Sequence, residues 1–426
     1  MKELAAQTRR ASRALASAAP ENRDSALSRL AELLEEREDS ILAANTRDLE
    51  AAEADGVEGP LLARLKLNGD KLAGLRAGLQ QLVDQGDPLG NPLRKTLLDD
   101  GLVLTQVTSP LGVLLVIFES RPDAVIQIGG LALRTGNGLI LKGGREAKHS
   151  NAILVDCIRE ALRDAGIPED AVNGVEGREA VHQLLDCDES IDLVIPRGSA
   201  QLVRSIQSTS RIPVMGHADG ICHLYLDKDA DVDMAIRVAV DGKCDYPAAC
   251  NATESLLVHR DFLPHLPAVG EALVAAGVEL RADSEAAAQL PTSTPAAETD
   301  GATEYGDLIL SVRVVDDLSD AISRIHEHGS GHTETIVTNN DETAAKFLAQ
   351  VDSASVFHNA STRFADGFRY GLGAEVGIST GRIHARGPVG ADGLLTTRWL
   401  LRGSGQVAAD YSGPNGRSYQ HRPLPL

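Results

Sequence analysis

The sequence predicts an α/β protein with two domains built on parallel sheets and a protruding β-hairpin. Three observations support this prediction. Continuous apolar runs such as GVLLVIFES (112–120) are typical of strands that are buried on both faces of a parallel sheet. Such runs alternate with helical periodicity from residue 112 onward, which is the pattern of doubly wound α/β folds. Two extended runs flank Asp100-Gly101, a dipeptide that favours a hairpin turn.

The expected elements follow in chain order. Up to about residue 85, apolar residues recur three and four apart, as in ALSRLAELLEEREDSILAANTRDLEAA, which predicts amphipathic helices. The hairpin occupies 93–109. A second alternation begins near Ile221, and the Ala-, Thr- and Asp-rich stretch 281–304 is expected to be a surface excursion. The further predicted strands are 138–144, 170–177, 191–199, 212–217, 221–227 and 254–259, and the further predicted helices are 151–166, 180–186, 200–208 and 232–243.

Composition excludes several classes of function. The 426 residues allow two or three domains, and 61 acidic against 41 basic residues give a net charge of -20. This charge repels nucleic acid and anionic membranes, so neither is an expected partner. No run of about eighteen apolar residues occurs, so no membrane span is expected. Five scattered cysteines without a CxxC pair, and no signal-peptide core, predict a cytoplasmic protein.

One cysteine and two loops are candidates for chemistry. Cys250, in DYPAACNATESLLVH, is either a reactive nucleophile or an ordinary buried thiol, and the stretch alone does not decide between them. No GxGxxG fingerprint occurs. Two other strand ends could hold the phosphates of a dinucleotide: LKGGREA, with Lys142 and Arg145, and IPRGSAQLV, with Gly198 and the predicted helix cap Ser199.

Several motifs together resemble those of the gamma-glutamyl phosphate reductases, which belong to the aldehyde dehydrogenase superfamily. They are, in chain order, SPLGVLLVIFESRPDAV, LKGGREA, IPRGS, HADG, DYPAACNA, ATEYGDLIL and NASTRFADGFRYGLGAEVGIST. The resemblance implies an aldehyde dehydrogenase-like fold and NADPH-dependent reduction of L-glutamyl 5-phosphate to glutamate 5-semialdehyde, the second step of proline synthesis from glutamate. It also implies that Cys250 is the nucleophile.

The resemblance also implies a division of the chain. We expect a cofactor-binding domain from 1–91 and 109–220 and a catalytic domain from 221–388. The hairpin 92–108 and the segment 389–426 are expected to serve homo-oligomerisation, because assembly covers exposed strand edges.

The expected catalytic residues surround Cys250. An acyl phosphate can pass its acyl group to a cysteine thiolate, and the oxyanions formed require hydrogen-bond donors. Asn251 is either such a donor or a cap of the local turn. The segment HADG, beginning at His217, replaces the superfamily's ELGG, so the glutamate that activates water in oxidising relatives is absent. His217 is then a base or a structural residue. Arg121 is expected to bind the acyl phosphate, or else to pair with a nearby carboxylate.

Other residues are assigned to ligands by the same resemblance. Arg363 is expected to hold the substrate α-carboxylate, unless it forms a structural ion pair. Glu304 is expected to bind the nicotinamide ribose. Arg145, three residues after Lys142, stands where NAD-specific relatives have a glutamate, which favours the 2′-phosphate of NADPH, unless Arg145 pairs with Glu146 or a helix carboxylate.

Alternatives and partners complete the prediction. The histidines of HEHGSGH (326–332) match no standard zinc spacing, so we expect incidental histidines and no metal. The chain could alternatively be another acylating aldehyde dehydrogenase, a thiol hydrolase that uses Cys250 with His217 or His223, or a subunit without catalytic activity. The partner of such a subunit would be a glutamate 5-kinase that hands over the labile acyl phosphate.

Overall fold

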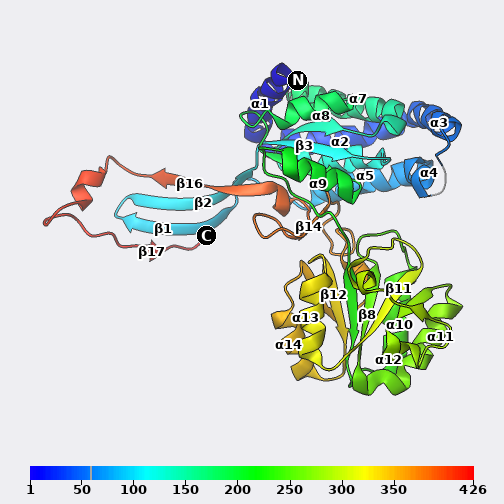
Figure 1. Ribbon diagram of the computed structural model, residues 1–426. Coiled ribbons are helices and arrows are strands. Elements are labelled where there is room, and N and C mark those ends of the chain that lie inside the picture. The colour runs from blue at the N-terminus through cyan, green and yellow to red at the C-terminus, as the bar shows by residue number, and fades with distance from the viewer. Residues whose placement is uncertain (58–59) are drawn as a thin grey trace.

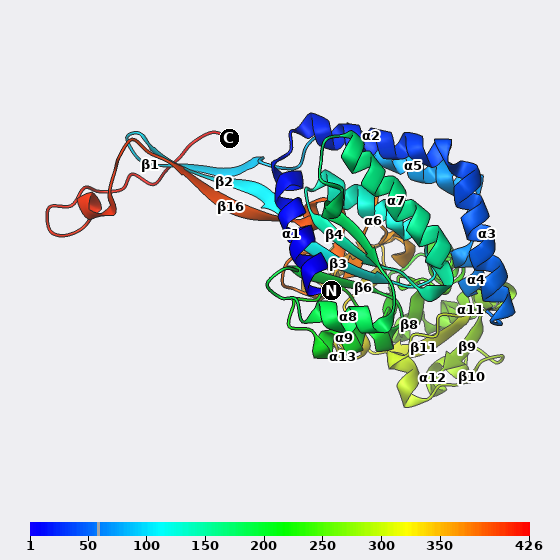
Figure 2. The same cartoon turned by 90° about the horizontal axis from the view of Figure 1, so that it is seen from above.

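The computed structural model describes residues 1–57 and 60–426 and contains three bodies. A four-stranded parallel sheet and its helices form the upper body in Figure 1, and a seven-stranded parallel sheet and its helices form the lower one. An antiparallel sheet extends from the upper body as an arm. Figure 2, seen from above, shows the same arm projecting away from both α/β bodies. Within the described residues, no helix has the length and apolar character needed to cross a membrane.

The amino-terminal part is helical, as predicted. Leu27, Leu30 and Leu34 recur three and four apart in α2 and are fully buried, because this helix packs on α5 and α7. Asn68 caps α5 by accepting a hydrogen bond from the Lys71 N–H. The helices are α1 (Lys2–Ser17), α2 (Pro20–Glu36), α3 (Glu38–Ala54), α4 (Pro60–Leu65) and α5 (Gly69–Asp84).

The four-stranded sheet has the order β5-β4-β3-β6, and all of its neighbouring strands are parallel. The central strand β3 is buried at every position, which explains its continuous apolar run. The strand predicted at 212–217 is wrong, since only Val214 forms a bridge, to Val194; Pro213 has no N–H to extend the pairing. The elements are β3 (Val113–Phe118), α6 (Asp123–Arg134), β4 (Gly138–Lys142), α7 (Lys148–Asp164), β5 (Val172–Val175), α8 (Arg178–Leu185), β6 (Leu193–Arg197) and α9 (Ala200–Thr209).

The seven-stranded sheet has the order β10-β9-β11-β8-β7-β12-β13, again with parallel neighbours. The span 281–304 is only partly the expected surface excursion, because a short helix and the edge strand β10 lie within it. The elements are β7 (Cys222–Leu226), α10 (Val232–Cys244), β8 (Thr253–His259), α11 (Leu266–Ala275), β9 (Glu279–Ala282), α12 (Ser284–Ala287), β10 (Thr294–Pro295), β11 (Ile309–Val315), α13 (Leu318–His328), β12 (Thr333–Val337), α14 (Asp341–Gln350) and β13 (Ser355–His358).

The arm contains the predicted hairpin. Strands β1 (Pro92–Asp99) and β2 (Leu102–Pro110) are joined by Asp100-Gly101, and Gly101 has a φ of 70°, which favours glycine. The carboxy-terminal strand β16 (Leu395–Arg402) pairs with β2 of the same chain along its whole length. β17 (Arg422–Pro423) pairs with β1 on the other side. The outer edge of β16 has no neighbouring strand among the described residues.

Candidate active site

The candidate site lies at the amino ends of three adjacent strands of the seven-stranded sheet. Cys250 lies in the turn between α10 and β8, His217 precedes β7, and His332 immediately precedes β12. Because β8, β7 and β12 are neighbours and parallel, their amino ends lie at one edge of the sheet. The Cys250 sulfur and one ring nitrogen of each histidine all lie within 4.8 Å of one another. Sequence reasoning considered His217 but treated His332 as incidental.

A short two-stranded sheet holds the ring of His217. Its Nδ1 lies 2.8 Å from the carbonyl oxygen of Ile378, in β14 (Ile378–Ser379), which pairs with β15 (Gly387–Pro388). A carbonyl can only accept a hydrogen bond, so we assign the ring proton to Nδ1. Nε2 then carries a lone pair that can accept a proton or bind a cation.

His332 is completely buried behind this site. Its ring meets that of His217 edge to face, with 5.0 Å between the ring centres. Nδ1 lies 2.8 Å from Oγ1 of Thr333, whereas Nε2 has no hydrogen-bond partner among the described residues. The sulfur of Cys222 is 3.7 Å from Nδ1, and burial raises the pKa of this thiol well above its usual value.

The glycine of HADG allows the segment to approach Cys250. A Cβ atom added to Gly220 would lie 2.3 Å from the Cys250 carbonyl oxygen and 2.5 Å from its Cα. Any side chain here would therefore displace the cysteine backbone. Asp219, the carboxylate of the same segment, is bound to Arg204 of α9. The segment thus brings backbone, and not a free carboxylate, against Cys250.

Asn251 and Arg363 bind each other. The Asn251 Nδ2 donates to the carbonyls of Arg363, at 3.4 Å, and Ala365, at 3.0 Å, and its Oδ1 accepts from the Arg363 guanidinium. Arg363 also forms an ion pair with Asp245 at 3.0 Å. Arg363 thus forms the structural ion pair that was its alternative role, whereas Asn251 binds a segment distant in the sequence, which is neither of the two roles considered for it. The predicted oxyanion donation by Asn251 and carboxylate binding by Arg363 gain no support from these contacts.

Two arginines lie at or just beyond the carboxyl ends of strands in the four-stranded sheet. Arg121 follows the carboxyl end of β3, is exposed, and forms no ion pair with any described residue, so the alternative of a nearby carboxylate partner is not realised. Arg197 ends β6, beside Phe118 at the end of β3. Burial, together with the positive charge of Arg121, lowers the pKa of Arg197. Its Nη1 is buried and has no hydrogen-bond partner in residues 1–57 and 60–426, and its Nη2 lies 3.9 Å from Glu375. Sequence reasoning missed Arg197, although it stands in the IPRGS motif.

All the expected cofactor residues except Glu304 lie at or just beyond carboxyl ends of strands in this sheet. Lys142 ends β4, and Arg145 begins the one-turn helix η1 (Arg145–Ala147), with a 91% exposed side chain that lies 3.4 Å from Asp55. Ser199 caps α9 as predicted, by accepting from the Leu202 N–H. The Ser199 N–H itself lies 3.3 Å from a carboxylate oxygen of Glu119. A Cβ on Gly198 would meet the same carboxylate, so Glu119 occupies the place expected for a cofactor phosphate.

Glu304 is exposed and lies in a segment held by a buried ion pair. The backbone N–H of Gly306 donates to Glu254 in β8, and Glu254 binds Lys243. The ring of Tyr305 lies 5.9 Å from the Lys243 ammonium. Glu304 is therefore attached to the same elements that carry Cys250.

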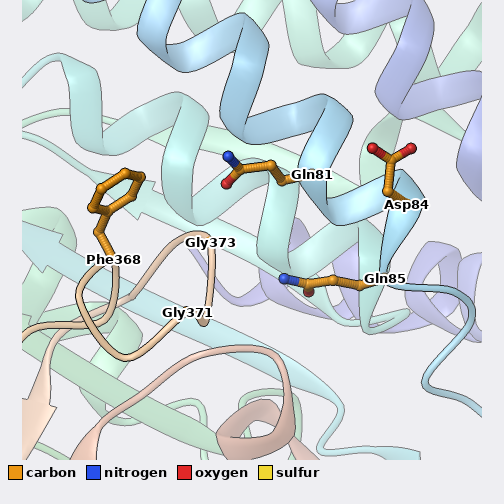
Figure 3. Close-up of a pocket in the computed structure, with 6 residues that line it drawn as sticks. All are labelled: Gln81, Asp84, Gln85, Phe368, Gly371 and Gly373. Atoms are coloured by element: carbon orange, nitrogen blue, oxygen red, sulfur yellow. The ribbon is translucent and has the colours of Figure 1, made fainter.

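A separate cavity of about 430 Å³ lies between the end of α5 and the loop 366–374. Figure 3 shows Gln81, Asp84 and Gln85 on the side of α5, opposite Phe368 and two loop glycines. It contains amides and one carboxylate but no cation or thiol in its lining, so we do not place the chemistry there.

The chain is similar to known proteins in both sequence and fold. The model of the aldehyde dehydrogenase family matches residues 1–300. A gamma-glutamyl phosphate reductase from Cyanothece sp. is 52% identical over 99% of this chain and 98% of its own. A delta-1-pyrroline-5-carboxylate synthase from Solanum lycopersicum is 51% identical over 99% of this chain but only 58% of its own. The crystal structure of a gamma-glutamyl phosphate reductase from Thermotoga maritima superposes with a TM-score of 0.92, at 38% identity, over 95% of this chain and 99% of that one.

Proposed function

The chain belongs to the aldehyde dehydrogenase family and, within it, to the gamma-glutamyl phosphate reductases, and on this premise we propose how its site performs the reaction. L-glutamyl 5-phosphate is reduced with NADPH to L-glutamate 5-semialdehyde and phosphate, the second step of proline synthesis from glutamate. The observation that carries the proposal is that the Cys250 sulfur lies within 4.8 Å of a ring nitrogen of His217, while the buried Arg197 has both Arg121 and Cys250 among the charged groups around it.

The first step forms a thioester. Nε2 of His217 accepts the proton of the Cys250 thiol, and the thiolate attacks the carbonyl carbon of the acyl phosphate. The carbon–sulfur bond forms, the carbon–oxygen bond to phosphorus breaks, and phosphate leaves. Arg121 and Arg197 favour this step because guanidinium groups bind the oxygens of a leaving phosphate. The backbone N–H of Cys250 is the proposed donor to the carbonyl oxyanion.

The second step releases the aldehyde. NADPH, when bound, supplies the hydride that converts the thioester to a thiohemiacetal oxyanion. This oxyanion collapses, the carbon–sulfur bond breaks, and Cys250 is regenerated as thiolate. Since Asp219 is engaged with Arg204, the HADG segment offers no free carboxylate to activate water against the thioester.

The residues at the carboxyl ends of β4 and β6 fit a dinucleotide. Lys142 and the exposed Arg145 provide positive charge for a 2′-phosphate, and the amino end of α9 at Ser199 provides N–H groups for the diphosphate. Glu119 would have to leave the Ser199 N–H when the diphosphate binds. Glu304 would hold the nicotinamide ribose. We accordingly assign 1–91 and 109–220 to cofactor binding and 221–388 to catalysis.

The test is oxidation of NADPH in the presence of glutamate kinase, glutamate and ATP, with each component omitted in turn. Cys250→Ser should fold normally and lose nearly all turnover, because a hydroxyl is a poor nucleophile at neutral pH. Cys244→Ser, a nearby cysteine outside the cluster, is the matched control. A variant Cys250→Ser that kept a tenth of the activity would contradict covalent catalysis.

The reverse reaction provides a second test. Semialdehyde and NADP⁺ should give steady NADPH only when phosphate is added, because phosphate releases the acyl group from Cys250. Steady NADPH formation in phosphate-free buffer would show that a residue activates water. In the forward direction, release of phosphate from the acyl phosphate without NADPH, at a rate that depends on Cys250, would instead support a thiol hydrolase that uses His217. The other candidate base, His223, is buried and bound to Glu334.

We propose that the arm joins a second copy of the chain. Trp399 is 49% exposed and Leu401 is 57% exposed on β16, whose outer edge has no neighbouring strand among the described residues. Exposed edges and apolar side chains of this kind are usually covered by assembly. Light scattering at micromolar concentration should detect an oligomer, and a fully active monomer would contradict the proposal.

Transfer of substrate from a glutamate 5-kinase in the cytoplasm is also part of the proposal. Acyl phosphates hydrolyse readily, so direct transfer protects the intermediate. Addition of an inactive kinase to the coupled assay should lower the rate, because it competes with the active kinase for the reductase. An unchanged rate would mean that the intermediate diffuses freely.

A further inference from the structure

We propose that His217, Cys250 and His332 form a binding site for a soft divalent cation of the zinc type, and that Zn²⁺ bound there blocks the cysteine. The three candidate ligand atoms lie within 4.8 Å of one another. A thiolate and two imidazoles are a preferred ligand set for Zn²⁺. Binding is independent of the proposed function, whereas inhibition rests on it.

The unpartnered nitrogen of His332 points to a ligand. The residue is 0% exposed, and its Nε2 has no hydrogen-bond partner among the described residues. A buried polar atom that is left without a hydrogen-bond partner destabilises the folded protein. Since Nδ1 is already 2.8 Å from the Thr333 hydroxyl, Nε2 is the atom available to a cation.

The second histidine has the surroundings of a metal ligand. Nδ1 of His217 donates to the carbonyl of Ile378 over 2.8 Å, which fixes the ring and leaves Nε2 free. Metal-binding histidines usually hold their other nitrogen in this way. Bonds of about 2.0 Å to nitrogen and 2.3 Å to sulfur place tetrahedral ligands about 3.3–3.6 Å apart. The three side chains would therefore have to close by about 1 Å.

The site is not visible in the sequence because its ligands come from three strand ends. His217, Cys250 and His332 precede β7, β8 and β12, so they are separated by 33 and 82 positions and show no zinc-motif spacing. Three protein ligands leave one coordination position for water. Because the sulfur is itself a ligand, a bound cation prevents formation of the thioester.

Direct binding is measured on the full-length, chelator-treated protein. Calorimetry should detect one Zn²⁺ per chain, and Co²⁺ should give the charge-transfer absorption of a cobalt–thiolate bond. Cys250→Ser should abolish that absorption. His332→Gln should weaken the binding of Zn²⁺ by about tenfold or more, because losing a ligand lowers the affinity at least as much as losing a contact around the ligands. The control His326→Gln, on α13 outside the cluster, should bind as the wild type does.

Alkylation gives a readout that does not depend on turnover. Zn²⁺ should slow the modification of Cys250 by iodoacetamide, as followed by peptide mass spectrometry, and EDTA should restore it. If His332→Gln does not fold, His217→Asn serves as the second ligand variant. Equal Zn²⁺ affinity in the wild type and a folded ligand variant, or unchanged alkylation of Cys250, would overturn the proposal even if the reductase activity is confirmed.

Discussion

Lys243 and Glu254 form a completely buried ion pair, with 2.6 Å between Nζ and Oε2 and neither side chain exposed. Lys243 lies in the last turn of α10 and Glu254 near the start of β8, so the pair closes the turn that carries Cys250. The other carboxylate oxygen accepts from the N–H of Gly306, next to the segment of Glu304. The pair therefore connects the nucleophile with the proposed ribose-binding segment.

Replacement of Glu254 by Gln should destabilise the protein strongly. The substitution leaves the Lys243 ammonium buried without a counter-charge, and breaking a buried pair in this way costs about 3–5 kcal/mol. The free energy of unfolding from urea denaturation above pH 7, where Glu254 is ionised, measures the effect. Glu342→Gln, which removes the exposed pair with Lys346 on α14, should change little. Equal stability of the two variants would contradict a structural role for the buried pair.

The same carboxyl should make stability depend on pH. Burial raises the pKa of Glu254 from 4.5 to about 7, because loss of hydration outweighs the attraction of Lys243. Between these pH values the folded protein binds more protons than the unfolded chain. The free energy of unfolding should therefore fall as the pH rises from 4.5 to about 7.

The measurement compares the wild type with the double variant Lys243→Met, Glu254→Gln, which lacks both charges. Other titrating groups cancel in the difference between the two unfolding curves. The unfolding free energy of the wild type minus that of the double variant should decrease as the pH rises from 4.5 to about 7. A difference that grows would show that Glu254 is ionised well below pH 7.

Arg197→Met should weaken the binding of phosphate and of the acyl phosphate. Its buried Nη1 has no hydrogen-bond partner in the part of the chain that the structure describes, so a phosphate oxygen is the proposed acceptor. A hydrogen bond to a charged group contributes roughly 1.5–3 kcal/mol, which corresponds to at least about tenfold in affinity. The KM for phosphate in the reverse reaction measures this loss, and Arg211→Met, at an exposed position, is the control. A lower kcat at unchanged KM would indicate that Arg197 does not bind the ground-state phosphate.

Much of the fold follows from the sequence, and the exceptions have physical causes. The run of β3 is apolar throughout because both of its faces are buried, and Asp100-Gly101 forms the expected turn. By contrast, 212–217 is apolar but does not continue as a strand beyond the bridge at Val214, since the chain turns toward Cys250 at His217. An apolar run indicates that side chains are buried, but it does not establish that the backbone pairs with a neighbouring strand.

Some site residues can be placed from local sequence patterns, and others depend on which strands are neighbours. Cys250, Arg121 and Ser199 lie where the motifs indicate, because their positions follow from local strand ends and caps. His332 and Arg197 were missed, since their contacts depend on which strands are neighbours in the sheet. Asn251 and Arg363 show the same limit, because the sequence does not reveal that they are each other's partners.

Arg145→Glu should weaken the binding of NADPH by at least tenfold and leave the binding of NADH nearly unchanged. The guanidinium is 91% exposed and makes only a 3.4 Å pair with Asp55, which is 67% exposed. Exposed pairs of this kind contribute little, so a 2′-phosphate can replace the carboxylate. Contacts between such a phosphate and guanidinium are worth roughly 1.5–3 kcal/mol. A glutamate would instead repel the phosphate and accept from the 2′-hydroxyl of NADH.

Asp55→Asn is the matched variant for this prediction. It removes the competing carboxylate and should strengthen the binding of NADPH slightly, while the binding of NADH is unaffected. Fluorescence titration of each reduced cofactor with each variant gives the four dissociation constants to be compared with the wild type. If Arg145→Glu weakens both cofactors equally, Arg145 supports the strand-end loop and does not contact the 2′-phosphate. Opposite effects of the two variants on the binding of NADPH alone would place the 2′-phosphate beside Arg145, where it competes with Asp55.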